Sequence, residues 1–214
     1  MCHAAERERI KWSFNPPSAP HFGGLWETGV KSFKTHLRRV VGDQTLSIEE
    51  FTTVLAQIEA VLNSRPLCPL STDPLDLEVL SPGHFLTMEP LVAVPSPDLT
   101  PLSTNRLGRW QLVQRIHQNF WRRWHKEHLG TLQQCPKWWT TANPLTVGSL
   151  VLIKDDNASP LRWKRGRVEA LHTGSDGVPR VATVRVANGS ISRPLVKLCP
   201  LPMGTAPRAT DSEK

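Results

Sequence analysis

Three stretches of the chain place apolar residues at helical spacing. The first repeats them every three or four positions, at Trp26, Val30, Phe33, Leu37 and Val40. This spacing forms one apolar face of a helix. The prolines up to Pro20 and the pair Gly23–Gly24 disfavour an earlier start, so the helix should begin near Leu25. Gly42 is placed to end it. The opposite, polar face carries Glu27, Lys31, Lys34 and Arg38.

The second stretch opens with a capping signal. Ser47 and Glu50 form an S-x-x-E capping box. The apolar positions that follow are Ile48, Phe51, Leu55, Ile58 and Leu62. Pro66 ends this helix, because proline disfavours helical backbone at its predecessor Arg65. We expect the first two helices to pack as a hairpin through their apolar faces.

A proline-rich segment separates the second helix from the third. Residues 67–103 contain seven of the 19 prolines, which predicts a linker with one short turn or helix near Ser81 to Phe85. Ser103 or Thr104 can then cap a long helix from about Asn105 to His128. Its broad apolar side comprises Leu107, Trp110, Val113, Ile116, Phe120 and Trp124. Its basic side is a candidate for contacts with nucleic-acid phosphates and comprises Arg115, Arg122 and Lys126.

From Leu145 onward the apolar period changes to two, which is typical of strands. Short strands are expected at residues 150–154, 164–171, 180–186 and 190–194. Turns are expected at Gly174 to Gly177 and at Asn188-Gly189, where both central residues of a two-residue hairpin turn would need positive φ. Four or five such strands in about 60 residues predict a small SH3-like β-barrel. The fold class is therefore α+β.

Charge is unevenly distributed along the chain. The formal net charge is +7, but residues 43–103 carry nine acids and one base, whereas residues 104–139 carry seven bases and one acid. Residues 140–214 add eleven bases and six acids. A basic block of this kind indicates a polyanionic partner, most plausibly nucleic acid, against the alternative of a generally solvated surface.

Cysteine and histidine spacing gives little support for a metal or disulfide framework. Cys2, Cys68, Cys135 and Cys199 lie far apart without a C-x-x-C pair, which fits a reducing compartment. His125, His128 and Cys135 match no common zinc spacing. No apolar run approaches a membrane span and the N-terminus has no signal-peptide core, so we expect a protein that is nuclear or cytoplasmic.

Two strings carry a family resemblance: N-P-P-S-A-P-H-F-G-G-L-W-E at Asn15 to Glu27 and L-N-S-R-P-L at Leu62 to Leu67. In them the sequence resembles the integrases of LTR retrotransposons, most closely those of the BEL/Pao group. L-S-P-G-H-F-L at 80–86 is also similar to a segment that follows the core in that family. V-G-S-L-V-L-I-K-D-D-N, W-K-R-G-R-V and R-P-L-V-K-L resemble the uncharacterised C-terminal domain that ends BEL/Pao integrases.

The resemblance implies specific roles for residues of the first helix. Glu27 matches the last acid of the Asp, Asp, Glu triad of the RNase H-like catalytic core. Lys31 and Lys34 match positions that lie near DNA in related integrases. The family places both aspartates upstream of this motif, but the acids before Glu27 are Glu6 and Glu8. The His/Cys zinc module that opens many integrases is also absent.

The resemblance therefore implies the C-terminal part of an integrase. The expected domains are truncated core helices at 1–66, the linker at 67–103, the basic helix at 104–139, the barrel at 140–202 and a disordered tail at 203–214. A single carboxylate cannot hold the two divalent ions that phosphoryl transfer needs. Mg²⁺ or Mn²⁺ is thus expected only in a complete integrase, with Glu27 as at most one ligand. Without chemistry, Glu27 would still be favoured by the helix macrodipole.

The expected barrel offers two kinds of binding site. A methyl-lysine cage needs several aromatic faces, and Trp163 is the only aromatic residue after Leu145. The basic residues around it favour backbone contacts with nucleic acid, with an occasional base stacked on Trp163. These residues are Arg162, Lys164, Arg165 and Arg167, with Arg185 and Arg193 on neighbouring strands. A core position for Trp163 is the alternative.

Three hypotheses of function follow. The first is an integrase-derived fragment that binds DNA without sequence preference and has no autonomous strand-transfer activity, hence no enzyme as this chain and no cofactor. The second is a host-retained interaction module that binds another integrase-like subunit, a second copy or a chromatin protein. The third is an active recombinase. A steep fall of DNA affinity with salt favours the first, and metal-dependent joining of DNA ends favours the third.

Overall fold

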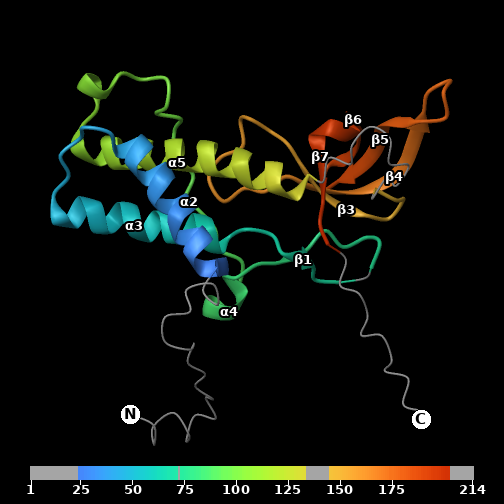
Figure 1. Ribbon diagram of the computed structural model, residues 1–214, viewed down its shortest axis with the longest axis horizontal. Coiled ribbons are helices and arrows are strands. Elements are labelled where there is room, and N and C mark those ends of the chain that lie inside the picture. The colour runs from blue at the N-terminus through green and yellow to red at the C-terminus, as the bar shows by residue number, and fades with distance from the viewer. Residues whose placement is uncertain (1–23, 72, 134–144, 203–214) are drawn as a thin grey trace, which may run out of the picture. The chain divides into compact units, whose positions relative to one another are not determined.

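The chain is described by a computed structural model over residues 24–71, 73–133 and 145–202, without the side chains of Leu25 and Trp26. It combines helices with a five-stranded antiparallel sheet (Figure 1), which confirms the α+β class. The chain divides into two compact units, Met1–Gly42 and Asp43–Lys214.

The described part of the first unit is one helix. α2 spans Gly24–Val41, one residue earlier than the predicted start at Leu25. Gly42 has φ +56° and its N–H donates to the Arg38 carbonyl at 3.1 Å. A left-handed residue at this position ends a helix and is easiest for glycine. Gly42 therefore ends the helix as predicted.

The second unit begins with the predicted capping box. α3 spans Ile48–Asn63, and the Ser47 N–H donates to Glu50 Oε2 at 2.8 Å while the Glu50 N–H donates to Ser47 Oγ at 3.2 Å. The predicted apolar face is wrong in the first half of the helix, because Ile48 is 81% and Phe51 41% exposed.

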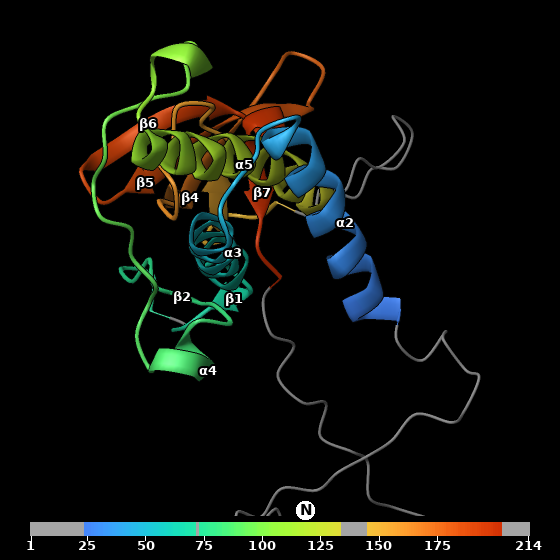
Figure 2. The same ribbon diagram turned by 90° about the vertical axis from the view of Figure 1, so that its left-hand side faces the viewer.

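The face of α3 that is fully buried contains Val54, Ile58 and Val61. Figures 1 and 2 show α3 running beside α5, the helix against which it packs. Val54 and Leu55 point about 100° apart around a helix axis. A shift by one position thus replaces Leu55 by Val54 on the buried face.

α5 spans Arg109–Leu132 and starts later than predicted. Ser103 caps a short 3₁₀ turn, η2 at Thr104–Arg106, and Gly108 is the N-cap of α5. The Gly108 N–H donates to the Gln111 side chain at 3.0 Å, so a later residue satisfies the free amide at the helix start. The large buried apolar residues of α5 are Leu112, Val113, Ile116, Phe120, Trp121, Trp124 and Leu129.

Two members of the predicted apolar side of α5 are misplaced. Leu107 precedes the helix, and Trp110 lies on it with 64% of its surface exposed. The Leu129 and Trp121 side chains are buried instead. The physical reason is that α5 packs against two partners, α3 and the sheet, and their positions decide which of its residues are buried.

The proline-rich segment is packed into the second unit. β1 at Cys68–Pro69 pairs antiparallel with β2 at Val79–Leu80. α4 at His84–Thr87 begins within the range predicted for a short helix and ends two residues beyond it. Leu77 and Val79 pack in the cluster that contains Leu129 of α5. The segment therefore contributes two short strands, a short helix and core residues to the second unit, in addition to connecting two helices.

The sheet has the strand order β6-β5-β4-β3-β7, with all neighbours antiparallel. Its strands are β3 at Leu150–Ile153, β4 at Arg165–Thr173, β5 at Pro179–Val186, β6 at Gly189–Pro194 and β7 at Leu198–Pro200. The first four lie close to the predicted ranges. β7 follows the 3₁₀ turn η3 at Leu195–Lys197 and was not among the predicted ranges.

The turn between β5 and β6 differs from the prediction by one residue. Val186 pairs with Gly189, so Ala187 and Asn188 form the two-residue turn. Among these residues Gly189 has positive φ, +116°. The Asn-Gly pair therefore marks the hairpin correctly, but glycine is needed at the first residue of the returning strand, outside the turn.

β3 is buried on both faces and explains where α5 lies. Its continuous run L-V-L-I alternates between two cores, as expected for a strand covered on both sides. Val151 and Ile153 face the core formed with β4 and β5. Leu150 and Leu152 face Leu129 of α5 and Val79 of the proline-rich segment. The C-terminal half of α5 is thereby held against the sheet.

Candidate polyanion-binding groove

α5 supplies one wall of a groove. Arg122, Arg123 and Lys126 are exposed and lie on one side of the helix, since residues three and four apart are neighbours on its surface. Phe120 and Trp124 on the other side are buried. Anchoring through these rings fixes the orientation of the basic side.

The second wall comes from two loops that adjoin the sheet. The loop after β3 contributes Lys154, Asp155 and Asp156, and η3 contributes Val196 and Lys197. These loops are joined by the hydrogen bond from the Lys154 N–H to the Lys197 carbonyl, 2.8 Å long. Antiparallel pairing of β3 with β7 places them side by side.

Gln133, directly after α5, connects the two walls. Its side-chain amide donates to the Val196 carbonyl at 2.6 Å and, more weakly, to the Leu198 carbonyl at 3.3 Å. Its Oε1 accepts from Lys154 Nζ at 2.5 Å. The ammonium group of Lys154 is thus held by a neutral amide oxygen.

The groove has a volume of about 720 Å³. It is lined by Asn119, Trp121, Arg122, Arg123, His125, Lys126, Leu129, Lys154, Asp155, Asp156, Val196 and Lys197. Five of these side chains are cations and two are carboxylates. The surplus of positive charge favours an anionic ligand, and its arrangement on both walls suits an extended polyanion.

The two carboxylates are paired with cations of the sheet region. Asp155 Oδ2 lies 3.2 Å from Lys164 Nζ, and Asp156 Oδ2 lies 3.8 Å from Lys197 Nζ. A hydrogen bond from the Asn157 N–H, followed by the contact with Lys164, lowers the pKa of Asp155. Asp155 is thereby held in its ionised form, and the two carboxylates oppose anion binding locally.

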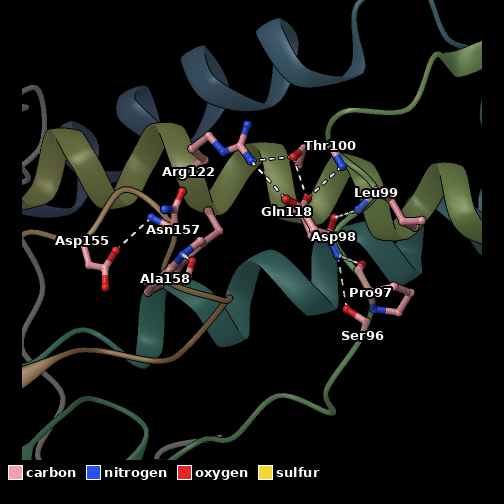
Figure 3. Close-up of polar contacts among 11 residues, drawn as sticks. Ser96, Pro97, Asp98, Leu99, Thr100, Gln118, Arg122, Asp155, Asn157 and Ala158 are labelled. Carbon is pink, nitrogen blue, oxygen red and sulfur yellow. Dashed lines mark hydrogen bonds and ion pairs between the residues drawn. The ribbon is translucent and has the colours of Figure 1, made fainter.

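One end of the α5 wall is joined to the proline-rich segment (Figure 3). The Arg122 guanidinium donates to Thr100 Oγ1 and lies 3.8 Å from Asp98 Oδ2. Gln118, one turn earlier, accepts from the Leu99 N–H at 2.9 Å and donates to the Pro97 carbonyl at 2.8 Å. Residues 96–100 are thus fixed against α5.

The groove brings together two of the predicted DNA-binding residues, Arg122 and Lys126, and leaves the other predicted residues elsewhere. Arg115 is half-buried, and its Nε and Nη1 atoms have no hydrogen-bond partner among the described residues. Arg162 is exposed outside the groove lining, and Lys164 pairs with Asp155.

Three basic residues of the sheet contact the proline-rich segment. Arg167 is only 8% exposed, and it donates to the Gly148 carbonyl at 2.9 Å and to the Asp76 carbonyl at 2.8 Å. Arg185 donates to the Pro74 carbonyl. Arg165 lies 3.7 Å from the Glu78 carboxylate. We call Arg165, Arg167 and Arg185 the arginine clamp.

Trp163 lies in a cluster of aromatic rings. Its ring centroid is 5.0 Å from that of Trp121, 6.0 Å from Trp124, 4.9 Å from His125 and 5.6 Å from His128. Its Nε1 donates to Ser64 Oγ at 3.1 Å. This placement favours the core alternative for Trp163, because protein groups already occupy the positions where a base would stack.

The two histidines of this cluster are kept neutral by burial. Burial lowers the pKa of His125 and of His128 to about 4 each. His125 stacks on Trp121 at 4.6 Å, and His128 stacks on Trp124 at 5.0 Å. Cys135, considered with them as a metal ligand, lies outside the described residues. Residues 24–71, 73–133 and 145–202 contain no group of three or more His, Cys, Asp or Glu side chains that could hold a metal ion.

Glu27 lies on the exposed face of α2. It lines one shallow concave surface together with Lys31, Lys34 and Arg38. The polar face predicted from the spacing of these four residues is therefore present. In the described part of the chain, moreover, no helix has the length and apolar character needed to cross a membrane.

Arg123, Lys154 and Lys197 line the groove but were not predicted. Arg123 directly follows Arg122 on the same helix. This adjacency was the only sequence signal that could have placed Arg123 in the groove. Lys154 and Lys197 are separated by 42 positions and meet through strand pairing. No local sequence pattern reports such a contact.

Residues 108–201, less than half of the chain, match the model of a family described as a family of unknown function (DUF5641). The matched range begins at the N-cap of α5 and ends one residue after β7. It therefore contains both walls of the groove. Neither the curated proteins nor the solved structures give a significant match.

Proposed function

We propose that this chain binds nucleic acid, DNA in the first place, through the groove between α5 and the sheet, without reading base sequence. The supporting observation is that five cations from three separate segments line one groove. Positive side chains along a groove contact successive phosphates and release their counterions, which supplies affinity independent of sequence. Trp121 in the groove is 2% exposed and offers no stacking platform.

The proposal extends to the origin of the chain. The motifs around Glu27 and the C-terminal strings resemble BEL/Pao integrases, and we propose that the chain derives from the end of an RNase H-like core and the domain that follows it. The strand order β6-β5-β4-β3-β7, with a 3₁₀ turn before β7, supports an SH3-like assignment for the sheet. Intracellular action on DNA, in the nucleus or cytoplasm, belongs to the same proposal.

The proposal assigns no catalytic step to Glu27. A two-metal site requires several carboxylates around ions about 3.5 to 4 Å apart. Within α2, Glu27 is the only acidic residue. Purified chain with Mg²⁺ or Mn²⁺ and labelled DNA ends should therefore yield no joined product. A metal-dependent product would overturn this part of the proposal.

A salt titration tests the binding proposal. Affinity for fluorescent duplexes of unrelated sequence should be equal and should fall with salt, with a log–log slope of about −3 to −5 if each groove cation contacts one phosphate. The variant Lys126→Glu should reduce the slope. Arg180→Glu, at an exposed cation outside the groove lining, is the matched control.

A flat salt response would remove the proposal. It would favour the alternative of an interaction module that binds another integrase-like subunit, a second copy or a chromatin protein, since such contacts depend less on counterion release. Equal effects of the groove variant and of Arg180→Glu would show that net charge alone drives binding, and would exclude the groove as the site.

A further inference from the structure

The segment before η2 contains two hydroxyl residues, Ser96, which is exposed, and Thr100, which is partly exposed. Residues 88–103 contain no helix or strand, and most of them are exposed. Ser96 is followed by Pro97, and Thr100 is followed by Pro101. One class of protein kinase modifies hydroxyls in this dipeptide, because its pocket for the next residue accepts a side chain without a backbone N–H. Exposed irregular segments are the usual substrates of modifying enzymes.

The two hydroxyls differ in what they contact. Thr100 Oγ1 donates to Asp98 Oδ1 at 2.6 Å and accepts from the Arg122 guanidinium. Ser96 Oγ accepts from the neutral amide of Gln118 at 3.2 Å. Figure 3 shows both contacts and the side chain of Arg122 reaching toward Thr100. Of the two hydroxyls, Thr100 is thus the one beside a groove cation.

We propose that Thr100 is a phosphorylation site for a proline-directed kinase and that its phosphate withdraws Arg122 from the groove. Thr100 Oγ1 attacks the γ-phosphorus of magnesium-bound ATP, and the bond from that phosphorus to the β–γ bridging oxygen breaks. ADP leaves, and the hydroxyl proton passes to the base of the kinase. The product carries about −1.5 to −2 charge at neutral pH.

The local charges determine the effect. A phosphate accepts two parallel hydrogen bonds from a guanidinium. This charged contact is stronger than the single hydrogen bond that Arg122 now donates to the neutral Thr100 hydroxyl. The Asp98 side chain is 65% exposed and turns into solvent when the phosphate repels it. The groove then loses one of its five cations and gains an anion at its rim. This regulatory effect rests on the proposed function, whereas the phosphate–Arg122 contact does not.

The first test concerns the modification itself. Full-length chain is incubated with ATP, Mg²⁺ and a proline-directed kinase, and the phosphate is located by fragmentation mass spectrometry, with Thr100→Val as the control. We expect phosphate at Thr100. In a ³¹P NMR titration its second pKa should lie lower in the parent chain than in Arg122→Gln. Absence of phosphate at Thr100, or equal phosphate pKa values in both chains, would overturn the proposal.

The second test concerns binding. Phosphorylated chain and Thr100→Asp should bind labelled duplex about fivefold more weakly than parent chain. Ser96→Asp adds a similar charge in the same segment away from Arg122 and should change affinity less than twofold, as should Thr100→Val. Equal losses for the two Asp variants would overturn the specific role of Thr100. If parent chain does not bind DNA, the proposed function fails while the first test still decides the site.

Discussion

The groove and the arginine clamp use the same kinds of residue for opposite purposes. Arg123 and Lys126 in the groove are exposed, and Lys154 is held by a neutral amide. Arg167 in the clamp is buried and donates to two backbone carbonyls of its own chain. In sequence all of them belong to one basic half of the chain. The comparison teaches that burial and existing partners decide whether a cation is available to a ligand.

The clamp also joins the basic second half of the chain to the acidic segment before it. Residues 43–103 carry nine of the 19 acids and one base, and Glu78 of this range faces Arg165. The main contacts of the clamp, however, are carbonyls of Pro74 and Asp76. The proline-rich segment is thus fixed by its backbone and by Leu77 and Val79 in the core.

Lowering the pH should have the largest effect on stability. This effect comes from buried histidines of α5 and not from the cations of the groove or of the clamp. Burial lowers the pKa of His117, His125 and His128 to about 4, below the ordinary value of 6.5. Unfolded chain therefore binds more protons between these values, and stability falls as pH falls through this window. From about pH 7 to about pH 5 the free energy of unfolding should decrease by about 2 kcal/mol for each histidine.

Urea titrations of the full chain at the two pH values measure this decrease. His125→Gln, which has no titrating ring, should show a decrease smaller by about a third, because one of the three histidines is removed. Arginine and lysine side chains ordinarily titrate above pH 10, so the cations of the groove and of the clamp do not contribute to this decrease. An unfolding free energy that does not depend on pH would contradict the placement of these histidines in the buried side of α5.

Removing the clamp residue Arg167 should have the next largest effect. Arg167→Ala leaves the carbonyls of Gly148 and Asp76 without their donor and opens space in a buried site, which should cost about 2 to 3 kcal/mol of stability. DNA affinity of the chain that remains folded should be unchanged. Denaturant unfolding measures the loss, and Arg180→Ala, whose side chain is 66% exposed, should change stability by less than about 0.5 kcal/mol.

Charge reversal in the groove should weaken DNA binding and leave stability nearly unchanged, which is the inverse of the result expected for Arg167→Ala. Arg123→Glu/Lys126→Glu should weaken DNA binding on the order of tenfold, because two phosphate contacts are lost and two repulsions are added. Stability should change by less than about 0.5 kcal/mol, since both side chains are exposed. Fluorescence anisotropy at fixed salt measures the first quantity. A loss of stability equal to that of Arg167→Ala would remove the distinction between the two regions.

Neutralising a groove carboxylate should have the smallest effect and the opposite sign. Asp156 is 75% exposed and lies 3.8 Å from Lys197, so Asp156→Asn releases that lysine for phosphate. DNA affinity should increase about two- to threefold. Asp176→Asn, at the acid that pairs with Arg180 outside the groove lining, should leave it unchanged. A weaker affinity of Asp156→Asn would show that the carboxylate assists binding.

Local signals predicted several elements well. The Ser47 and Glu50 capping box, the end of α2 at Gly42 and the first four strands of the sheet all follow from hydrogen-bonding and steric rules that act within a few residues. The buried face of α3 and the start of α5 were predicted incorrectly. Both depend on where the partner helix or sheet lies, which periodicity alone does not report.

The candidate site could be predicted only in part for the same reason. Arg122 and Lys126 share a helix face by spacing, and both line the groove. Arg167 and Lys164 lie beside Trp163 in sequence, but alternation along β4 and the neighbouring proline-rich segment direct them to other partners. Trp163 itself is enclosed by rings from α5, more than thirty positions away.

The sequence by itself determined the α+β class, the position of most helices and strands, and the excess of positive charge in the second half. These properties depend on local propensity, periodicity and composition. The tertiary structure alone decided which cations face solvent together and which are used to hold the chain. Lys154 and Lys197 meet because β3 pairs with β7, and Arg167 is buried because the proline-rich segment covers it. Such contacts arise from packing between distant segments.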